Sequence, residues 1–192
     1  MSVKENIHLR IIGGSLRGKN LASLSGYEIR PTADRLRESI FSIIAARVPN
    51  AVVLDLFAGT GAFGIEALSR HARAAVFIDN SRAAVTVIYQ NLEMCRFLDR
   101  ARVILSDITR GLGRIPMPQP RFDLVFMDPP YDRGFVCKGL NLLRRNPILA
   151  PGHCLILEHS SREPLPLDLK GFLLHDQRRY GKTLVSFLEC VL

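Results

Sequence analysis

The sequence predicts an α/β domain with a doubly wound, mostly parallel, seven-stranded sheet, a small β-hairpin before it and an antiparallel hairpin at its C-terminal end. Short apolar runs typical of buried strands alternate with longer amphipathic segments typical of helices. Such alternation requires right-handed crossovers and gives a parallel sheet. Several of the apolar runs end at an aspartate, which places carboxylates at the edge where open α/β sheets bind their ligands.

The composition is that of an ordinary globular protein of 192 residues, which is long enough to bury its own core. No apolar stretch approaches the roughly 18 residues of a membrane span, and residues 1–10 lack the apolar segment of a secretory signal. We therefore expect a cytoplasmic protein that makes no use of a membrane. Four scattered cysteines without CxxC spacing indicate neither a metal site nor disulfides. The net charge of +8 favours nucleic acid as a partner.

The chain is predicted to divide into a basic N-terminal extension, residues 1–29, and the sheet domain, residues 30–192. In the extension a short apolar run, a glycine pair and a second turn glycine indicate a small hairpin. Arg10, Arg17 and Lys19 cluster on this hairpin, outside the sheet. They are therefore candidates for contacts with a polyanion.

The first helix is predicted to begin from Arg30, where Pro31 precedes a Thr32 cap and Asp34 occupies the first turn. Its apolar stripe consists of Leu36, Ile40, Ile43 and Ile44. The segment Val48-Pro49-Asn50 ends it.

Strands and helices then alternate along the chain. The parallel strands are predicted over residues 52–57, 75–78, 103–105, 122–127 and 154–157. The helices between them are predicted over residues 62–69, 81–97 and 135–146. Two final strands, 173–180 and 183–190, are joined through Gly181 and should form the antiparallel hairpin. Pro116, Pro118 and Pro120 indicate a loop within the domain.

Carboxylates occupy the ends of four predicted strands. Asp55 lies at the exit of the first strand, and Asp79, Asp107 and Asp128 follow the next three. The carboxyl ends of parallel strands face one crevice at a single edge of the sheet. We therefore expect the ligand site at this edge.

A glycine-rich turn, residues 59–64, matches the pattern G-x-G-x-x-G, and Asp79 follows the second glycine by 18 residues. Both features fit a dinucleotide fold, in which the acid binds ribose hydroxyls. Asp55 at the mouth of the turn is unfavourable near a pyrophosphate but favourable near a cation. The sequence thus favours S-adenosylmethionine, which has an ammonium, a sulfonium and no phosphate. Asp79 would bind its ribose, and Asp107 with Ile108 would flank its adenine.

The tetrapeptide Asp128-Pro129-Pro130-Tyr131 directly follows a strand-like apolar run. The two prolines fix φ and remove two N–H donors, so that nearby carbonyls face outward. The Asp128 carboxylate, these carbonyls and the Tyr131 ring suit a flat base whose exocyclic NH2 donates hydrogen bonds. A surface turn without function is the alternative interpretation.

These motifs together resemble those of a known family. Residues 55–61, Asp-Leu-Phe-Ala-Gly-Thr-Gly, and the Asp-Pro-Pro-Tyr tetrapeptide are similar to class I S-adenosylmethionine-dependent methyltransferases that act on an amino nitrogen. The narrower resemblance is to the RsmD-type enzymes, which methylate N2 of a guanine in bacterial 16S ribosomal RNA. It is found in residues 10–14 with Arg17-Gly18, in residues 30–32 with 37–41, and in the turn Tyr180-Gly181.

The resemblance implies a role for each motif. Catalysis would fall to Asp128, Pro129, Pro130 and Tyr131, with Asp128 and the Pro129 carbonyl accepting hydrogen bonds from the amine and Tyr131 stacking on the base. S-adenosylmethionine would be bound by Arg30, Thr32, Asp55, Phe57, Gly59, Gly61, Asp79, Asn80, Asp107 and Ile108. The cationic hairpin residues Arg10, Arg17 and Lys19 would contact RNA. The substrate would be 16S rRNA within an assembled or assembling small ribosomal subunit, and no metal is expected.

Two other classes of function stay open. An amino-methyltransferase for DNA adenine or cytosine, or for a protein glutamine, could use the same tetrapeptide, although the chain has no room for a separate DNA-reading domain. A nicotinamide-dependent oxidoreductase, or a Rossmann module that only binds, would fit the glycine turn alone. Arg178, Arg179 and Lys182 near the final turn are either solvated charges or phosphate contacts, and His153 and His159 are interpreted as structural or surface residues.

Overall fold

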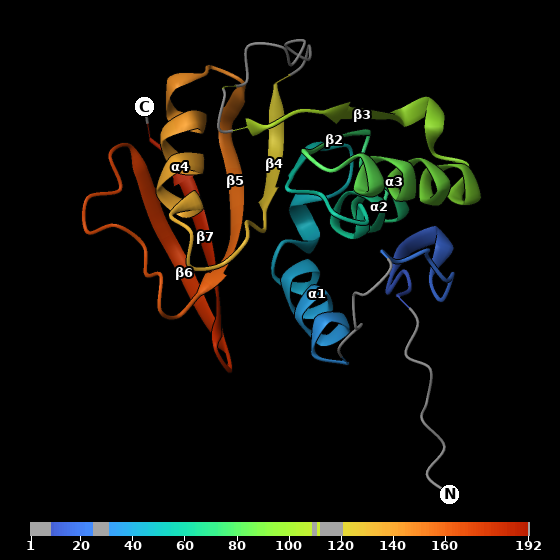
Figure 1. Cartoon of the computed structure of the whole chain (residues 1–192), viewed down its shortest axis with the longest axis horizontal. Coiled ribbons are helices and arrows are strands. Elements are labelled where there is room, and N and C mark those ends of the chain that lie inside the picture. Colours follow the sequence, from blue (N-terminus) through green and yellow to red (C-terminus); the bar gives the residue numbers. More distant parts are fainter. Residues whose placement is uncertain (1–8, 25–30, 109–110, 112–120, 192) are drawn as a thin grey trace, which may run out of the picture.

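The computed structural model describes residues 9–24, 31–108, 111 and 121–191. Its strands are β1 (Val52–Leu56), β2 (Ala74–Asp79), β3 (Ala101–Leu105), β4 (Phe122–Met127), β5 (Leu149–Ser160), β6 (Phe172–Tyr180) and β7 (Thr183–Cys190). They form one sheet in the order β3-β2-β1-β4-β5-β7-β6 (Figure 1). Pairs from β3 to β5 are parallel, whereas β7 is antiparallel to both β5 and β6. The predicted seven-stranded, mostly parallel sheet with its C-terminal hairpin is therefore confirmed.

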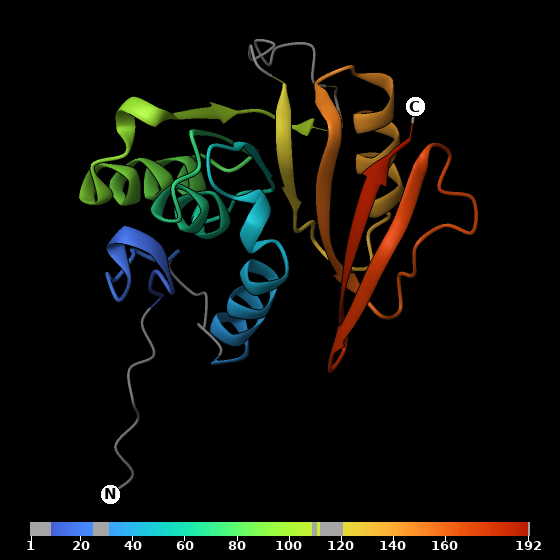
Figure 2. The ribbon, with the colours of Figure 1, turned by 180° about the vertical axis from the view of Figure 1, so that it is seen from behind.

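Helices cover both faces of this sheet, as a doubly wound fold requires. The α-helices are α1 (Pro31–Ile43), α2 (Ala62–Ser69), α3 (Arg82–Cys95) and α4 (Phe135–Arg145). The first three pack on one face and α4 packs on the other (Figures 1 and 2). Strand β4 shows the alternation behind this arrangement, because Phe126 joins the hydrophobic cluster under α1 and α2 while Met127 joins the cluster under α4.

Helix boundaries differ slightly from the predicted ones. The helix α1 ends at Ile43, and a 3-10 turn (Ala45–Arg47) replaces its last predicted turn. Helix α3 begins after Ser81, whose Oγ accepts a hydrogen bond from Ala84 N over 3.3 Å, and it ends at Arg96 in the left-handed conformation, with φ of 58°. Strand β5 begins at Leu149 and is longer than the apolar run that predicted it.

The N-terminal hairpin is a short antiparallel pairing with a single β-bridge, Arg10 to Asn20, and a 3-10 turn (Gly14–Leu16) between its arms. Ile11 N donates to Lys19 O over 2.9 Å, and Leu21 N donates to Leu9 O over 2.7 Å. The arms are too short to form named strands.

This hairpin packs closely on α2. The fully buried carboxylate of Glu66 accepts hydrogen bonds from Ile12 N and Gly13 N, both over 2.7 Å, and pairs with Arg70 over 2.7 Å. A Cβ on Gly14 would lie 2.0 Å from Ser69 O, so only glycine permits this approach. Apolar side chains of the hairpin also join the core cluster of α1 and α2. The predicted boundary at residue 29 falls in residues 25–30, outside the described residues.

Candidate active site

The glycine turn between β1 and α2 has the backbone shape that its sequence predicts. Phe57, Gly59 and Gly61 all have positive φ, of 59°, 56° and 76°, and Gly61 is the left-handed N-cap of α2. A Cβ on Gly64 would come within 2.3 Å of the Phe77 ring, so glycine allows α2 to pack against β2. The turn therefore brings backbone to the carboxyl edge of the sheet with little side-chain cover.

Asp79 connects this turn to the end of β2. Its Oδ2 accepts a hydrogen bond from Gly59 N over 2.8 Å, and its Oδ1 accepts one from Ser81 N over 2.8 Å. Each carboxylate oxygen has capacity for a further donor, such as a ribose hydroxyl. The structure thus places the Asp79 carboxylate at the glycine turn.

Asp55 lies beneath the same turn. It is 3% exposed, and its Oδ2 accepts a hydrogen bond from Gly64 N over 2.9 Å. Burial is the main cause that raises the pKa of Asp55 to about 8, with a further contribution from the charge of Asp79, although the Gly64 N–H opposes the shift. A cation bound nearby would favour the ionised carboxylate, which is the behaviour expected of a ligand-binding acid.

The remaining candidate cofactor residues lie along the same edge of the sheet or outside the described residues. Asp107 and Ile108 follow Ser106 in the loop after β3, and Ile108 is buried in the cluster against which Phe57 packs. Asn80 follows β2 and is exposed. Thr32 lies in the first turn of α1, where only the backbone is described, and Arg30 lies outside the described residues.

The Asp-Pro-Pro-Tyr tetrapeptide follows β4, next to the glycine turn. Met127 at the end of β4 pairs with Leu56 of β1 on one side and with Leu157 of β5 on the other. Asp128 and Pro130 are exposed, Pro129 is buried, and Tyr131 is 39% exposed. The two predicted motifs are therefore neighbours at the carboxyl ends of adjacent parallel strands.

Glu158 is a candidate functional residue that the sequence analysis missed. The Tyr131 hydroxyl donates a hydrogen bond to its Oε1 over 2.6 Å and lies 3.4 Å from Thr183 Oγ1. Like Asp79 and Asp128, Glu158 stands immediately after an apolar run, residues 154–157. Applying the strand-end rule to glutamate as well as aspartate would have identified it.

The two carboxyls beside Tyr131, those of Asp128 and Glu158, both have raised pKa values. Although Asp128 is open to solvent on one side, close packing by the protein raises the pKa of its carboxyl well above the usual value, and the charges of Glu158 and Asp55 add to this. Burial likewise raises the pKa of Glu158. Burial and these acids raise the pKa of Tyr131, so its hydroxyl stays a neutral donor.

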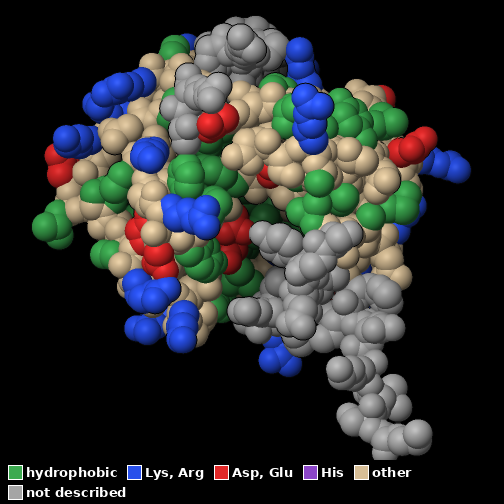
Figure 3. All heavy atoms as spheres, viewed as in Figure 1, with side chains coloured by type: hydrophobic (Ala, Val, Ile, Leu, Met, Phe, Trp, Pro, Cys, Tyr) green, Lys and Arg blue, Asp and Glu red, His purple; other side chains and the backbone are tan. Residues whose placement is uncertain are grey.

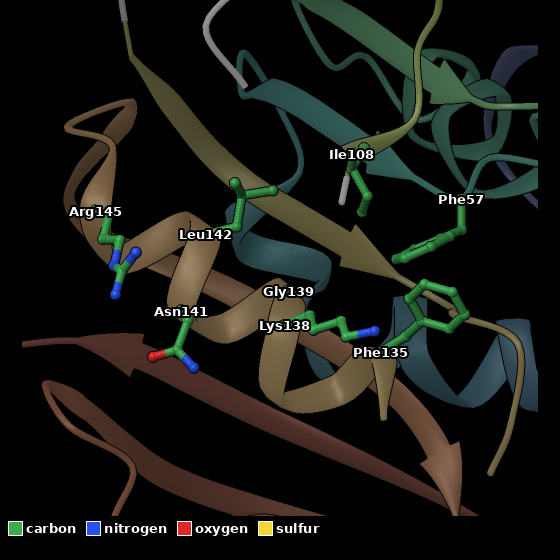
Figure 4. A pocket seen from close by; sticks show the side chains of 8 residues that line it. All are labelled: Phe57, Ile108, Phe135, Lys138, Gly139, Asn141, Leu142 and Arg145. Carbon is green, nitrogen blue, oxygen red and sulfur yellow. The ribbon is translucent and has the colours of Figure 1, made fainter. Parts of the chain in front are cut away.

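A pocket of about 280 Å³ adjoins the site on the side of α4 (Figure 4). Phe57 and Phe135 meet edge to face, with ring centroids 5.6 Å apart, and Ile108 points toward the same space. The pocket thus shares Phe57 and Ile108 with the predicted cofactor residues, and α4 adds Lys138, which the sequence analysis did not select.

The N-terminal hairpin, which carries the three predicted RNA contacts, lies against α2 and α3 (Figure 1). Arg10 pairs with Asp34 over 3.1 Å, Lys19 Nζ donates to Met94 O at the end of α3, and Arg17 is exposed. Within the described ranges no group of three potential ligands could hold a metal ion. None of the helices described has the length and apolar character to cross a membrane.

Residues 9–189 match the family described as Conserved hypothetical protein 95. The Ribosomal RNA small subunit methyltransferase D of Escherichia coli strain K12 is 36% identical over 174 residues, covering 91% of this chain and 86% of that protein. The protein of the same name from Haemophilus influenzae is 31% identical over 157 residues, covering 82% and 81%. The solved structure of Escherichia coli yhhF has a TM-score of 0.84 and 32% identity, covering 96% of this chain and 98% of that one. The chain therefore belongs to the Conserved hypothetical protein 95 family, that of the RsmD-type methyltransferases which its motifs resemble.

Proposed function

We propose that this protein transfers a methyl group from S-adenosylmethionine to the exocyclic N2 amine of a guanine in bacterial 16S rRNA, in the cytoplasm. One observation supports this most directly. The Asp128 carboxyl and the exposed Tyr131 ring stand at the end of β4, beside the glycine turn at the end of β1. The proposed hydrogen-bond acceptor for the guanine and the proposed cofactor-binding turn are therefore adjacent, as direct transfer of a methyl group between two bound molecules requires.

The residues of the glycine turn fit the proposed cofactor. Asp79 has acceptor capacity for ribose hydroxyls, and buried Asp55 would gain from a nearby ammonium or sulfonium. At Gly59 the space that a Cβ would occupy is open, which leaves room for a ligand against the turn. A dinucleotide would bring its pyrophosphate toward Asp55, which is unfavourable. When bound, S-adenosylmethionine supplies an activated methyl group.

The chain's own residues would prepare the amine. Hydrogen bonds from the NH2 group to the Asp128 carboxylate and the Pro129 carbonyl favour a pyramidal nitrogen with its lone pair directed outward. The same acceptors stabilise the positive charge that develops on the nitrogen. Tyr131 would hold the base by stacking, since bases taken out of a helix are commonly held on aromatic rings.

The choice of ribosomal RNA is supported by the relatives, which are named for the small ribosomal subunit. The net charge of +8 agrees with a polyanionic substrate. On the N-terminal hairpin, exposed Arg17 is the strongest candidate for a phosphate contact, with Arg10 and Lys19 beside it. We propose that assembled or assembling subunits present the guanine to this protein.

Methylation assays with labelled S-adenosylmethionine test this proposal. Free 16S rRNA, small subunits from a strain lacking the gene, and duplex DNA are offered in parallel, and the methylated nucleotide is mapped. We expect methyl incorporation at guanine N2 of 16S rRNA, highest on subunits. Preferential incorporation into DNA or protein would overturn the substrate, while tight binding of NAD without binding of S-adenosylmethionine would overturn the reaction class.

A further inference from the structure

The turn between β6 and β7 lies at the same edge of the sheet as the candidate active site. We call residues 178–182 the hairpin tip. Tyr180 pairs with Thr183 across this hairpin, and Thr183 Oγ1 lies 3.4 Å from the Tyr131 hydroxyl. Thr183 also pairs with Ser160, two residues beyond Glu158 on β5. The hairpin tip is therefore a direct neighbour of the proposed base-stacking residue.

Two contacts hold the hairpin tip in place. The Tyr180 hydroxyl is hydrogen-bonded to Ser39 Oγ of α1, and Ser161 N donates to Lys182 O over 2.9 Å. These contacts come from α1 and from the residue after β5, so the backbone of the turn is held in place relative to Tyr131. A pre-positioned cationic element loses less conformational entropy on binding than a free one.

The hairpin tip is strongly basic. Arg178, Arg179 and Lys182 are all exposed, and Figure 3 shows Lys and Arg side chains gathered over this end of the hairpin, at the lower left. Arg178 is partly neutralised by Asp176, at 2.7 Å, whereas Arg179 Nε donates to Gly181 O over 3.0 Å. Among the described residues, no carboxylate lies within ion-pair distance of Arg179 or Lys182.

The acidic centre of the site and the basic hairpin tip suit two different parts of one ligand. The centre of the site holds the carboxyls of Asp128 and Glu158, whose oxygens can accept hydrogen bonds from an amine and are unfavourable neighbours for a phosphate. The hairpin tip beside it attracts phosphate. A nucleotide within an RNA chain has both groups, with the base able to reach the acidic centre while the flanking backbone stays on the basic edge.

We propose that the hairpin tip binds the RNA backbone phosphates next to the target guanine, through Arg179 and Lys182. This inference rests on the proposed function and adds a second RNA contact, separate from the N-terminal hairpin. One strand of nucleic acid passes Tyr131 and the hairpin tip together, which holds the base in register with the acceptors at Asp128.

The test compares two matched double variants. Arg179→Gln with Lys182→Gln removes two charges from the hairpin tip. Arg73→Gln with Arg102→Gln, which we call the opposite-edge variant, removes two exposed charges at β2 and β3, on the side of the sheet farthest from β6. All four substitutions are at exposed positions. Binding of 16S rRNA is measured over a series of salt concentrations, methylation by initial rates, and S-adenosylmethionine affinity by calorimetry.

The hairpin-tip variant should bind RNA at least about fivefold more weakly, and the slope of log K against log salt should become shallower by about 1–2, as expected for losing one or two phosphate contacts. Its KM for RNA should rise while its affinity for S-adenosylmethionine stays that of wild type. The opposite-edge variant should behave as wild type. Equal effects of both variants, or no effect of the hairpin-tip variant while wild type methylates rRNA, would overturn this inference alone. Absence of rRNA methylation by wild type would overturn the proposed function and this inference with it.

Discussion

The Tyr131 hydroxyl donates a hydrogen bond to Glu158 Oε1 over 2.6 Å and so connects the loop after β4 to the end of β5. The ring itself stays 39% exposed, so the hydroxyl is held by the protein while the aromatic face remains available. Because a fixed ring requires no reorientation when a base stacks on it, this hydrogen bond would preorganise the substrate site.

The first prediction concerns this pair. Tyr131→Phe keeps the ring and removes the hydroxyl, and should lower kcat/KM for RNA about fivefold, since one net hydrogen bond contributes about 1 kcal/mol. Tyr131→Ala removes the ring as well, and should weaken RNA binding by a further factor of about 10, within the range of base–aromatic stacking. A double-mutant cycle of Tyr131→Phe with Glu158→Gln measures the coupling between them. Strict additivity of the two effects would show that the hydrogen bond has no role in methylation.

The second prediction concerns Asp128. Asp128→Ala should lower the single-turnover rate of methyl transfer by about 10²–10³-fold, the loss typical of one preorganised partner of the transition state. Asp128→Asn keeps one acceptor and should retain more activity. Affinity for S-adenosylmethionine, measured by calorimetry, should be nearly unchanged in both variants. A wild-type rate in the alanine variant would remove Asp128 from the reaction.

The third prediction concerns Asp79. Asp79→Ala should weaken S-adenosylmethionine binding by about 1.5–3 kcal/mol, because charged hydrogen bonds to the ribose are lost together with the hydrogen bond to Gly59 N. Asp79→Asn, which keeps one oxygen acceptor, should lose less. Circular dichroism and thermal unfolding establish that each variant is folded. Unchanged affinity in a folded alanine variant contradicts the assignment.

The fourth prediction concerns the attachment of the N-terminal hairpin. Glu66→Ala leaves Arg70 unpaired and removes the acceptors for Ile12 N and Gly13 N, so it should lower the free energy of unfolding by about 3–5 kcal/mol. Urea unfolding followed by two probes measures the loss. Glu93→Ala, at a helical surface position, is a control that should change stability by less than about 0.5 kcal/mol. A small loss in Glu66→Ala would indicate that the hairpin is an independent extension.

The sequence was sufficient to predict the order of strands and helices along the chain because most of the parallel strands are short, mainly apolar runs that end near an acid or a turn. The neighbourhood of the glycine turn and the tetrapeptide also followed, since parallel strands place their carboxyl ends together. The interpretation of His159 as a structural or surface residue agrees with the structure, in which its ring is buried between Glu163 O and Ser186 Oγ, both at 2.9 Å.

What the sequence did not predict depends on contacts between distant residues. Glu158 follows an apolar run that the sequence shows, but its hydrogen bond with Tyr131, from the loop after β4, is visible only in the fold. The sequence predicts the N-terminal hairpin as an extension outside the sheet, but not that Glu66, 53 residues away from Gly13, accepts hydrogen bonds from its backbone. Hydrophobic periodicity identifies which face of an element is buried but not which partner covers it.

The last prediction concerns the buried carboxyl of Asp55, whose pKa is raised to about 8. A raised pKa means that the unfolded chain ionises first, so the protonated carboxyl stabilises the folded state fully below about pH 4, and this stabilisation is lost as the pH rises to 8. Relative to Asp55→Asn, whose side chain never ionises and whose Oδ1 can still accept from Gly64 N, wild type should lose up to about 1.4 kcal/mol of unfolding free energy per pH unit within this window. Urea unfolding of both proteins at intervals from pH 5 to 8 measures the difference, in which titrations common to both cancel.

Saturating S-adenosylmethionine should reduce this difference in stability between wild type and Asp55→Asn, because a cation beside Asp55 favours its ionised form. NAD at the same concentration should leave the difference unchanged. Parallel stability curves for the two proteins without ligand would show that Asp55 titrates as an ordinary carboxyl.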